Sequence, residues 1–212
     1  MKILFMETEW KNRWNDRYSS KTFAYGEEPN RYFKEKLDML KPGNLLLPAE
    51  GEGRNAVYAA GKGWKVFAFD ISEEGRKKAI MLANKKKVKI TYQVGRVEEL
   101  SYPELYFDVM ALIYAHFPAP LKSKYHRALS KFLKPGGTVI LEAFSKNHLA
   151  CLARNAKVGG PKEIEMLFSK EEILADFGEY DFSELVETEI ELNEGDFHNG
   201  TGSVIRFTAT KH

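Results

Sequence analysis

Apolar runs and helix-forming segments alternate along the chain from Asn44 to Phe144. The runs "LLLPA", "KVFAFDI", "VKITYQV", "FDVMALIYA" and "TVILEAF" are predicted strands, and "FDVMALIYA" lacks the polar alternation of a half-exposed strand, which indicates that both of its faces are covered. Between the strands lie helix signals, such as Ser72, which can cap "EEGRKKAIMLANKK". Strand and helix in turn predict right-handed crossovers, and therefore a parallel sheet with helices on both faces.

The two ends of the chain differ from this alternating middle. Residues 10–42 form two predicted helical pieces rich in aromatic side chains, the second beginning near Pro29. Toward the other end, "SKEEILADF" has a capping box and predicts a helix, while "FSELVETEIELNEG" and "GSVIRFTAT" predict an antiparallel hairpin joined by "NEGDFHNGTG". We therefore predict one α/β protein with a doubly wound, seven-stranded, mostly parallel sheet and a C-terminal antiparallel strand. Residues 1–43 would form an N-terminal helical lid on a core at 44–212.

Length and charge narrow the range of partners. The chain has 212 residues, which suits one domain, and a net charge of +2, which gives no general reason for binding nucleic acid or an anionic membrane. The first apolar run is too short for a signal peptide, and Cys151 as the one cysteine excludes a disulfide framework. We expect a cytoplasmic protein, a monomer or homodimer, that acts on a small molecule and uses neither metal, nucleic acid nor membrane.

The predicted topology brings distant segments together. In an open α/β sheet, ligands bind outside the carboxyl ends of the strands. The loops that follow the predicted strands hold Gly51, Asp70, His116 and Gly160, and His198 joins them if the first hairpin strand runs parallel to the rest. We therefore expect these residues to converge on one face of the protein.

The loop after the first strand, Ala49 to Asn55, is compatible with more than one ligand. It lacks the Gly-Lys-Ser/Thr of a triphosphate loop, whereas the segment from Gly51 to Ala56 formally satisfies the dinucleotide pattern G-x-G-x-x-A. Glu50 and Glu52 in this loop repel a diphosphate but attract an ammonium and a sulfonium. S-adenosylmethionine carries both cations, and its ribose diol suits Asp70 at the end of the next strand. Electrostatics therefore favour S-adenosylmethionine.

Several segments together resemble the class I S-adenosylmethionine-dependent methyltransferases over nearly the whole chain. They are "LLLPAEGEGRNAVYAA", "KVFAFDIS", "YFDVMALIYAHFP" and "LKPGGTVILEAF". Within that class the chain is most similar to the bacterial tellurite-resistance methyltransferase-like group, through "WNDRYSSKTFAYGEEPN", "AEGEGRN", "AHFP", "GGPKEIEML" and "NEGDFHNG". The resemblance implies a Rossmann-like methyltransferase fold with S-adenosylmethionine as cofactor.

The resemblance also implies roles for individual residues. Around the cofactor, one set of residues would contact the methionine part, the ribose, the adenine and the sulfonium in that order. These are Ala49, Glu50, Gly51 and Gly53; then Asp70; then Ile71 and Val97; then Tyr114 and Ala115. Arg96 stands where the family often has an acid near adenine, which is a departure. We assign Tyr25 to the cofactor as well, and Trp14, Gly160 and Pro161 to the substrate.

The two histidines on the ligand face, His116 and His198, are the predicted catalytic residues. An unperturbed imidazole titrates at about pH 6.5, so His116 could deprotonate an oxygen or nitrogen acceptor, while His198 is expected at the substrate site. A thiol or a chalcogen oxyanion would need no such base. The predicted function is methyl transfer to a small acceptor of one of these kinds. The alternatives are a non-catalytic S-adenosylmethionine-binding module and a nicotinamide-dependent reductase.

Overall fold

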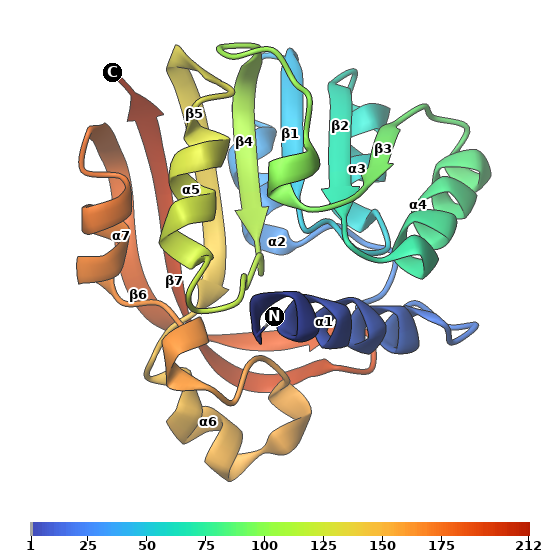
Figure 1. Cartoon of the computed structure of the whole chain (residues 1–212), viewed down its shortest axis with the longest axis vertical. Helices are drawn as coiled ribbons and strands as arrows, with labels where there is room; N and C mark the ends of the chain where they lie inside the picture. The colour runs from blue at the N-terminus through green and yellow to red at the C-terminus, as the bar shows by residue number, and fades with distance from the viewer. Residues whose placement is uncertain (1) are drawn as a thin grey trace.

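A computed structural model describes residues 2–212, with side chains from Thr8 onward. The described residues form seven helices, three short 3-10 turns and seven strands. The strands make a single sheet, and helices cover both of its faces (Figure 1). The helices are α1 (Lys2–Tyr18), α2 (Arg31–Leu37), α3 (Arg54–Gly61), α4 (Glu73–Lys86), α5 (Lys122–Ser130), α6 (His148–Arg154) and α7 (Lys170–Asp176). The strands are β1 (Asn44–Pro48), β2 (Lys65–Asp70), β3 (Thr91–Val94), β4 (Phe107–Ile113), β5 (Leu133–Phe144), β6 (Tyr180–Glu194) and β7 (His198–Lys211).

The sheet has the strand order β3-β2-β1-β4-β5-β7-β6. Strand β1 pairs in parallel with both β2 and β4, so the direction in which strands are added reverses between β1 and β4. A crevice opens outside the carboxyl ends at such a reversal. The fold class predicted from the sequence, a seven-stranded and mostly parallel doubly wound sheet, is confirmed.

An apolar core lies on each face of the sheet, and side chains at alternate positions of β1 pack into one core or the other. Leu46 packs with residues of α5 and α7, whereas Leu45 and Leu47 pack on the opposite face with residues of α2, α3 and α4. All three leucines are fully buried. Because successive strand residues point to opposite faces, this apolar run without polar alternation is what a strand covered on both sides requires.

The helix-start signals act as predicted. Ser72 Oγ accepts the N–H of Gly75 at 3.0 Å and caps α4. Ser169 and Glu172 form the reciprocal capping box of α7, with Ser169 N donating to Glu172 Oε2 at 3.1 Å. Each cap satisfies backbone donors that the first helical turn leaves unpaired.

The C-terminal hairpin lies where the sequence predicts, although its connection is shorter. Strand β7 pairs antiparallel with β5, and β6 pairs antiparallel with β7, so β6 runs in the direction of the parallel strands. The turn at residues 195–197 therefore reaches the carboxyl edge of the sheet. Glu194 and His198 already pair across the hairpin, so much of the predicted loop "NEGDFHNGTG" belongs to the strands.

Two further elements depart from the prediction. The segment "KPGG", expected to close a helix, lies inside β5, because Leu133 pairs with Phe107 before the register shifts. Helix α1 begins at Lys2 rather than near Trp10, and it lies across the carboxyl ends of the parallel strands, with the hairpin curving beneath it (Figure 1). The division of the chain at residue 43 into lid and core stays a prediction.

Candidate functional site

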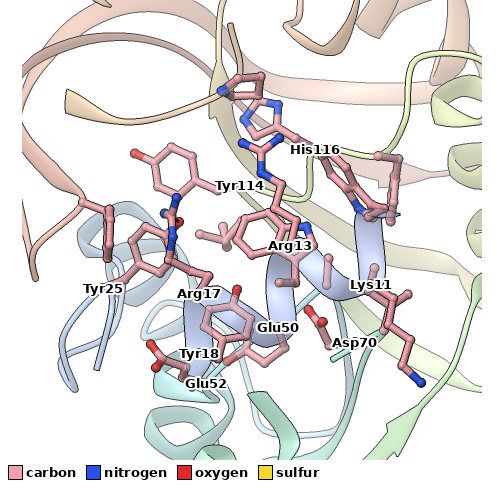
Figure 2. Close-up of a pocket in the computed structure, with 18 of the residues that line it drawn as sticks. Lys11, Arg13, Arg17, Tyr18, Tyr25, Glu50, Glu52, Asp70, Tyr114 and His116 are labelled. Atoms are coloured by element: carbon pink, nitrogen blue, oxygen red, sulfur yellow. Dashed lines mark hydrogen bonds between the residues drawn. The ribbon is translucent and has the colours of Figure 1, made fainter. Parts of the chain in front are cut away.

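A cavity of about 1510 Å³ lies between the carboxyl ends of the strands and α1 (Figure 2). Most residues predicted from the sequence line it, although they come from eight separate stretches of the chain. They are Trp14, Tyr25, Ala49, Glu50, Asp70, Ile71, Val97, Tyr114, His116, Gly160, Pro161 and His198. Gly51, Gly53 and Ala115 are buried but are not part of the lining.

Asp70 holds the glycine loop against the end of β2. Its carboxylate accepts the N–H of Gly51 at 3.0 Å and the N–H of Ser72 at 2.8 Å. Burial raises the pKa of Asp70 to about 6, against the lowering effect of these hydrogen bonds. Each carboxylate oxygen can accept a further hydrogen bond, so Asp70 can support the loop and still receive hydroxyl groups from the cavity.

Glu50 performs two tasks in the same loop. Its carboxylate accepts the N–H of Ala56 at 2.7 Å and the side-chain amide of Asn55 at 3.4 Å, which satisfies the start of α3, and it also lines the cavity. Burial raises the pKa of Glu50 to about 7, against these hydrogen bonds. The carboxyl group therefore changes charge near neutral pH, and a cation in the cavity would stabilise its ionised form.

The two loop glycines are required by the surrounding packing. Gly51 has φ +58, and a Cβ atom there would lie 2.5 Å from the hydroxyl oxygen of Tyr18 on α1. Gly53 has φ +84, and its Cβ would lie 2.5 Å from the Cβ of Ala79 on α4. Gly53 thus lets α3 and α4 pack closely, and Gly51 lets α1 approach the loop.

The second loop acid, Glu52, binds protein groups. It contacts Nζ of Lys78 at 2.5 Å and accepts the N–H of Ala24 at 2.7 Å. Burial raises the pKa of Glu52 even though Lys78 opposes this effect. The pair fastens the segment between α1 and α2 to α4, so Glu50 is the loop acid whose charge remains available to a ligand.

His116 is buried with both ring nitrogens engaged by the backbone. Nδ1 lies 3.0 Å from the carbonyl oxygen of Met166, and Nε2 accepts the N–H of Phe144 at 3.3 Å. This pattern assigns the proton to Nδ1. Burial lowers the pKa of His116 to about 3, despite the bond to Met166. The geometry therefore does not favour the predicted role of His116 as a base, because its lone pair is already used.

His198 has the opposite arrangement. Nδ1 contacts Glu194 Oε2 at 2.9 Å, and the rings of Tyr25 and Tyr114 lie 4.5 and 4.6 Å from the imidazole. Nε2 has no hydrogen-bond partner among the side chains and backbone groups described from Thr8 onward, and the side chain lines the cavity. Burial lowers the pKa of His198, although Glu194 opposes the shift, so the ring is neutral at pH 7. Its free nitrogen is a proton acceptor.

Glu194 and Arg54 form a buried support for His198. Arg54 Nη2 contacts Glu194 Oε2 at 2.9 Å and Nη1 donates to the carbonyl oxygen of Tyr25 at 3.2 Å. Although burial opposes it, the hydrogen bond with His198 and the charge of Arg54 lower the pKa of Glu194 to about 2. Sequence reasoning missed Glu194. Glu194 stands four residues before His198 in the sequence, and this spacing indicates a contact only when the two residues are known to pair across the hairpin.

Helix α1 is attached at both sides of the cavity. Asn15 Oδ1 accepts from Ser72 Oγ at 2.8 Å and from the N–H of Glu73 at 3.1 Å, at the start of α4. At the hairpin, the guanidinium of Arg17 lies 3.8 Å from the ring centroid of Phe197 and donates to the hydroxyl of Tyr25 at 3.0 Å. The helix thus covers one side of the cavity, in the place expected of an N-terminal lid.

Between residues 2 and 212, no group of three or more His, Cys, Asp or Glu side chains is placed to hold a metal ion. None of the helices in that range combines the length and apolar character needed to cross a membrane.

Comparisons with known proteins find similarity to methyltransferases. Residues 48–137 match the family model of a methyltransferase domain. The chain is 28% identical over 128 residues to a ubiquinone/menaquinone biosynthesis C-methyltransferase, UbiE, from Hydrogenovibrio crunogenus. That match covers 56% of this chain and 49% of the relative, so the chain spans about half the length of the curated relative it matches.

Solved structures share the fold. TehB from Haemophilus influenzae has a TM-score of 0.70 at 16% identity, covering 95% of this chain and 67% of that one. The magnesium protoporphyrin IX methyltransferase ChlM from Synechocystis PCC 6803, solved with bound SAH, has a TM-score of 0.71 at 17% identity, covering 97% and 100%. Identities this low show a common architecture only.

Proposed function

We propose a function for this chain on the premise of its family: it belongs to the class I S-adenosylmethionine-dependent methyltransferases, and S-adenosylmethionine is its cofactor. Our proposal is methyl transfer to a small acceptor whose O–H or N–H proton is taken by His198. The observation that carries it is the neutral imidazole of His198, supported by ionised Glu194 and open to the cavity.

The cavity suits the cofactor in size and charge. Its volume of about 1510 Å³ leaves room for an acceptor beside the cofactor. Asp70 would receive the ribose hydroxyls, and Glu50 would attract the ammonium group, as each faces the cavity (Figure 2). Ile71 and Val97 would pack on the adenine, and Tyr25 and Tyr114 would lie toward the methyl-donor end. Ala49, Gly51, Gly53 and Ala115 would act through the backbone that shapes this surface.

When bound, the cofactor supplies a methyl group already activated by its sulfonium. The acceptor would take up this methyl group while its proton goes to Nε2 of His198, and the cofactor would leave as S-adenosylhomocysteine. The chain contributes alignment, exclusion of water and a base. Glu194 then stabilises the imidazolium that forms, because its carboxylate lies on Nδ1. Trp14, Gly160 and Pro161 would form the wall of the cavity around the acceptor.

An acceptor panel tests the proposal. The full chain is incubated with methyl-labelled S-adenosylmethionine and with a phenol, an amine, a thiol or tellurite, and formation of S-adenosylhomocysteine is measured. We expect product above the acceptor-free rate with an O–H or N–H acceptor, and loss of it in His198→Asn. Turnover confined to the thiol or tellurite, unchanged in that variant, would contradict the role of His198. Cofactor binding without turnover on any acceptor would favour a non-catalytic binding module.

A further inference from the structure

The basic side chains that line the cavity fall into two groups. Near the cofactor loop, each lysine or arginine on the rim has a carboxylate partner or a backbone partner. These contacts are Lys11 with Glu73 at 3.1 Å, Lys77 with Glu74 at 2.7 Å, Arg96 with Glu99 at 3.0 Å, and Arg76 with the carbonyl oxygen of Tyr92 at 3.3 Å. Their charge is therefore largely used within the protein.

Arg13 and Arg17 form the other group, one helical turn apart on α1. Figure 2 shows both projecting from α1 toward the side of the cavity where Tyr114 and His116 lie. The guanidinium of Arg13 lies 5.2 Å from the ring centroid of Trp10, and Arg17 contacts Tyr25 and the Phe197 ring. Within the described part of the chain, neither has a carboxylate within ion-pair distance.

The rest of this side strengthens the positive field. Lys157 and Lys162 also line the cavity here and form no ion pair with the side chains described from Thr8 onward, while the carboxylates on the same side are Glu163 and Asp196. Cations therefore outnumber carboxylates on the acceptor side, although the whole chain is nearly neutral. A guanidinium bound to an aromatic face keeps its N–H edges free, and these edges match carboxylate and phosphate oxygens.

We infer that the methyl acceptor carries an anionic group, a carboxylate or a phosphate, which Arg13 and Arg17 bind while His198 receives the acceptor proton. The inference rests on the proposed function and names the substrate class of the same site. The aromatic rings of Trp14, Phe144 and Phe197 on this side suit an apolar body between the anionic group and the reacting atom.

Binding of small probes tests the inference without turnover. The full chain, with and without saturating S-adenosylhomocysteine, is titrated calorimetrically with benzoate, phenyl phosphate and benzamide. We expect at least one anion to bind about tenfold more tightly than benzamide, its neutral counterpart. The better of the two anions identifies the group. Equal binding of benzamide and both anions would overturn the inference.

Variants of Arg13 locate the site. Within the described residues no hydrogen bond or cation–π contact joins Arg13 to the hairpin, whereas Arg17 lies on the Phe197 ring, so Arg13→Gln removes charge with less disturbance of α1 than a change at Arg17. We expect Arg13→Gln to weaken the anion several-fold and spare benzamide, Arg13→Lys to restore part of the loss, and the control Lys77→Gln to have no effect. Unchanged anion binding in Arg13→Gln would contradict the assignment. The probe titrations are also run without S-adenosylhomocysteine, so anion binding and cofactor binding are measured separately. Failure of the unaltered chain to bind S-adenosylhomocysteine would count against the proposed function and not against the anion site.

Discussion

Nδ1 of His198 lies 2.9 Å from Oε2 of Glu194, and the same carboxylate oxygen lies 2.9 Å from Arg54. Glu194 therefore joins the hairpin histidine to the first residue of α3, directly after the glycine loop. Cofactor side and acceptor side meet at one buried carboxylate.

The negative charge of Glu194 beside His198 should support catalysis. Glu194→Gln keeps a hydrogen-bond acceptor but cannot stabilise a protonated imidazole, so we expect kcat to fall about 10- to 100-fold. The pKa of His198 falls further without the negative charge, and the acid limb of the pH–rate profile moves to lower pH. Glu191→Gln, on the exposed part of the same strand, is the control. An acid limb that stays in place would exclude Glu194 from this role.

The two histidines should respond differently to the same change. His198→Asn removes the free nitrogen, so we expect loss of turnover while S-adenosylhomocysteine affinity stays within about twofold. His116→Asn leaves two backbone groups without their partner, so we expect the free energy of unfolding to fall by about 1–3 kcal/mol, with turnover per folded molecule largely kept. Urea denaturation and kcat of both variants measure this. The reverse outcome would restore His116 as the base.

Cofactor affinity should depend on pH through Glu50 and Asp70. Burial raises the pKa of Glu50 to about 7 and that of Asp70 to about 6, so both take up protons as the pH falls through this range. The ammonium and sulfonium of S-adenosylmethionine prefer the ionised carboxylates, so affinity should weaken as the pH falls, roughly tenfold between pH 8 and pH 6. Glu50→Gln should flatten this dependence. A wild-type affinity that is constant over the interval would contradict the assignment of Glu50.

Gly53 offers a test of packing against its matched control, Gly63. Both glycines have positive φ, +84 and +89, but a Cβ at Gly63 meets nothing within 4 Å, whereas one at Gly53 meets Ala79. Each change to Ala pays for backbone strain, and Gly53→Ala adds a clash between α3 and α4. We expect Gly53→Ala to be more destabilising than Gly63→Ala by about 1–3 kcal/mol in urea denaturation. Equal losses would show that packing against α4 is not the constraint.

Local patterns predicted the elements that depend on local causes. The caps at Ser72 and Ser169 satisfy donors three residues away, and the apolar run of β1 has neighbours on both faces, so sequence alone indicates each. The glycine loop and Asp70 were placed together because carboxyl ends of parallel strands share one edge.

What the sequence could not predict depends on contacts between distant segments. Arg54 and Glu194 are 140 residues apart, and their pairing follows from the hairpin register and the approach of α3. The contrast between His116 and His198 is equally a tertiary effect, since both looked like loop histidines beside glycine or aromatic residues. No local pattern marks Arg13 and Arg17 as ligand-facing, because only the position of α1 over the strands turns that face toward the cavity.

The most direct test of the account is calorimetric titration of the full chain with S-adenosylhomocysteine, and in parallel with a reduced nicotinamide dinucleotide. We expect saturable binding of S-adenosylhomocysteine, weakened at least about tenfold in Asp70→Ala because the loop loses its support and the ribose its acceptor. We expect no binding of the dinucleotide. No binding of S-adenosylhomocysteine at millimolar concentration by the folded protein, or tighter binding of the dinucleotide, would contradict S-adenosylmethionine as the cofactor.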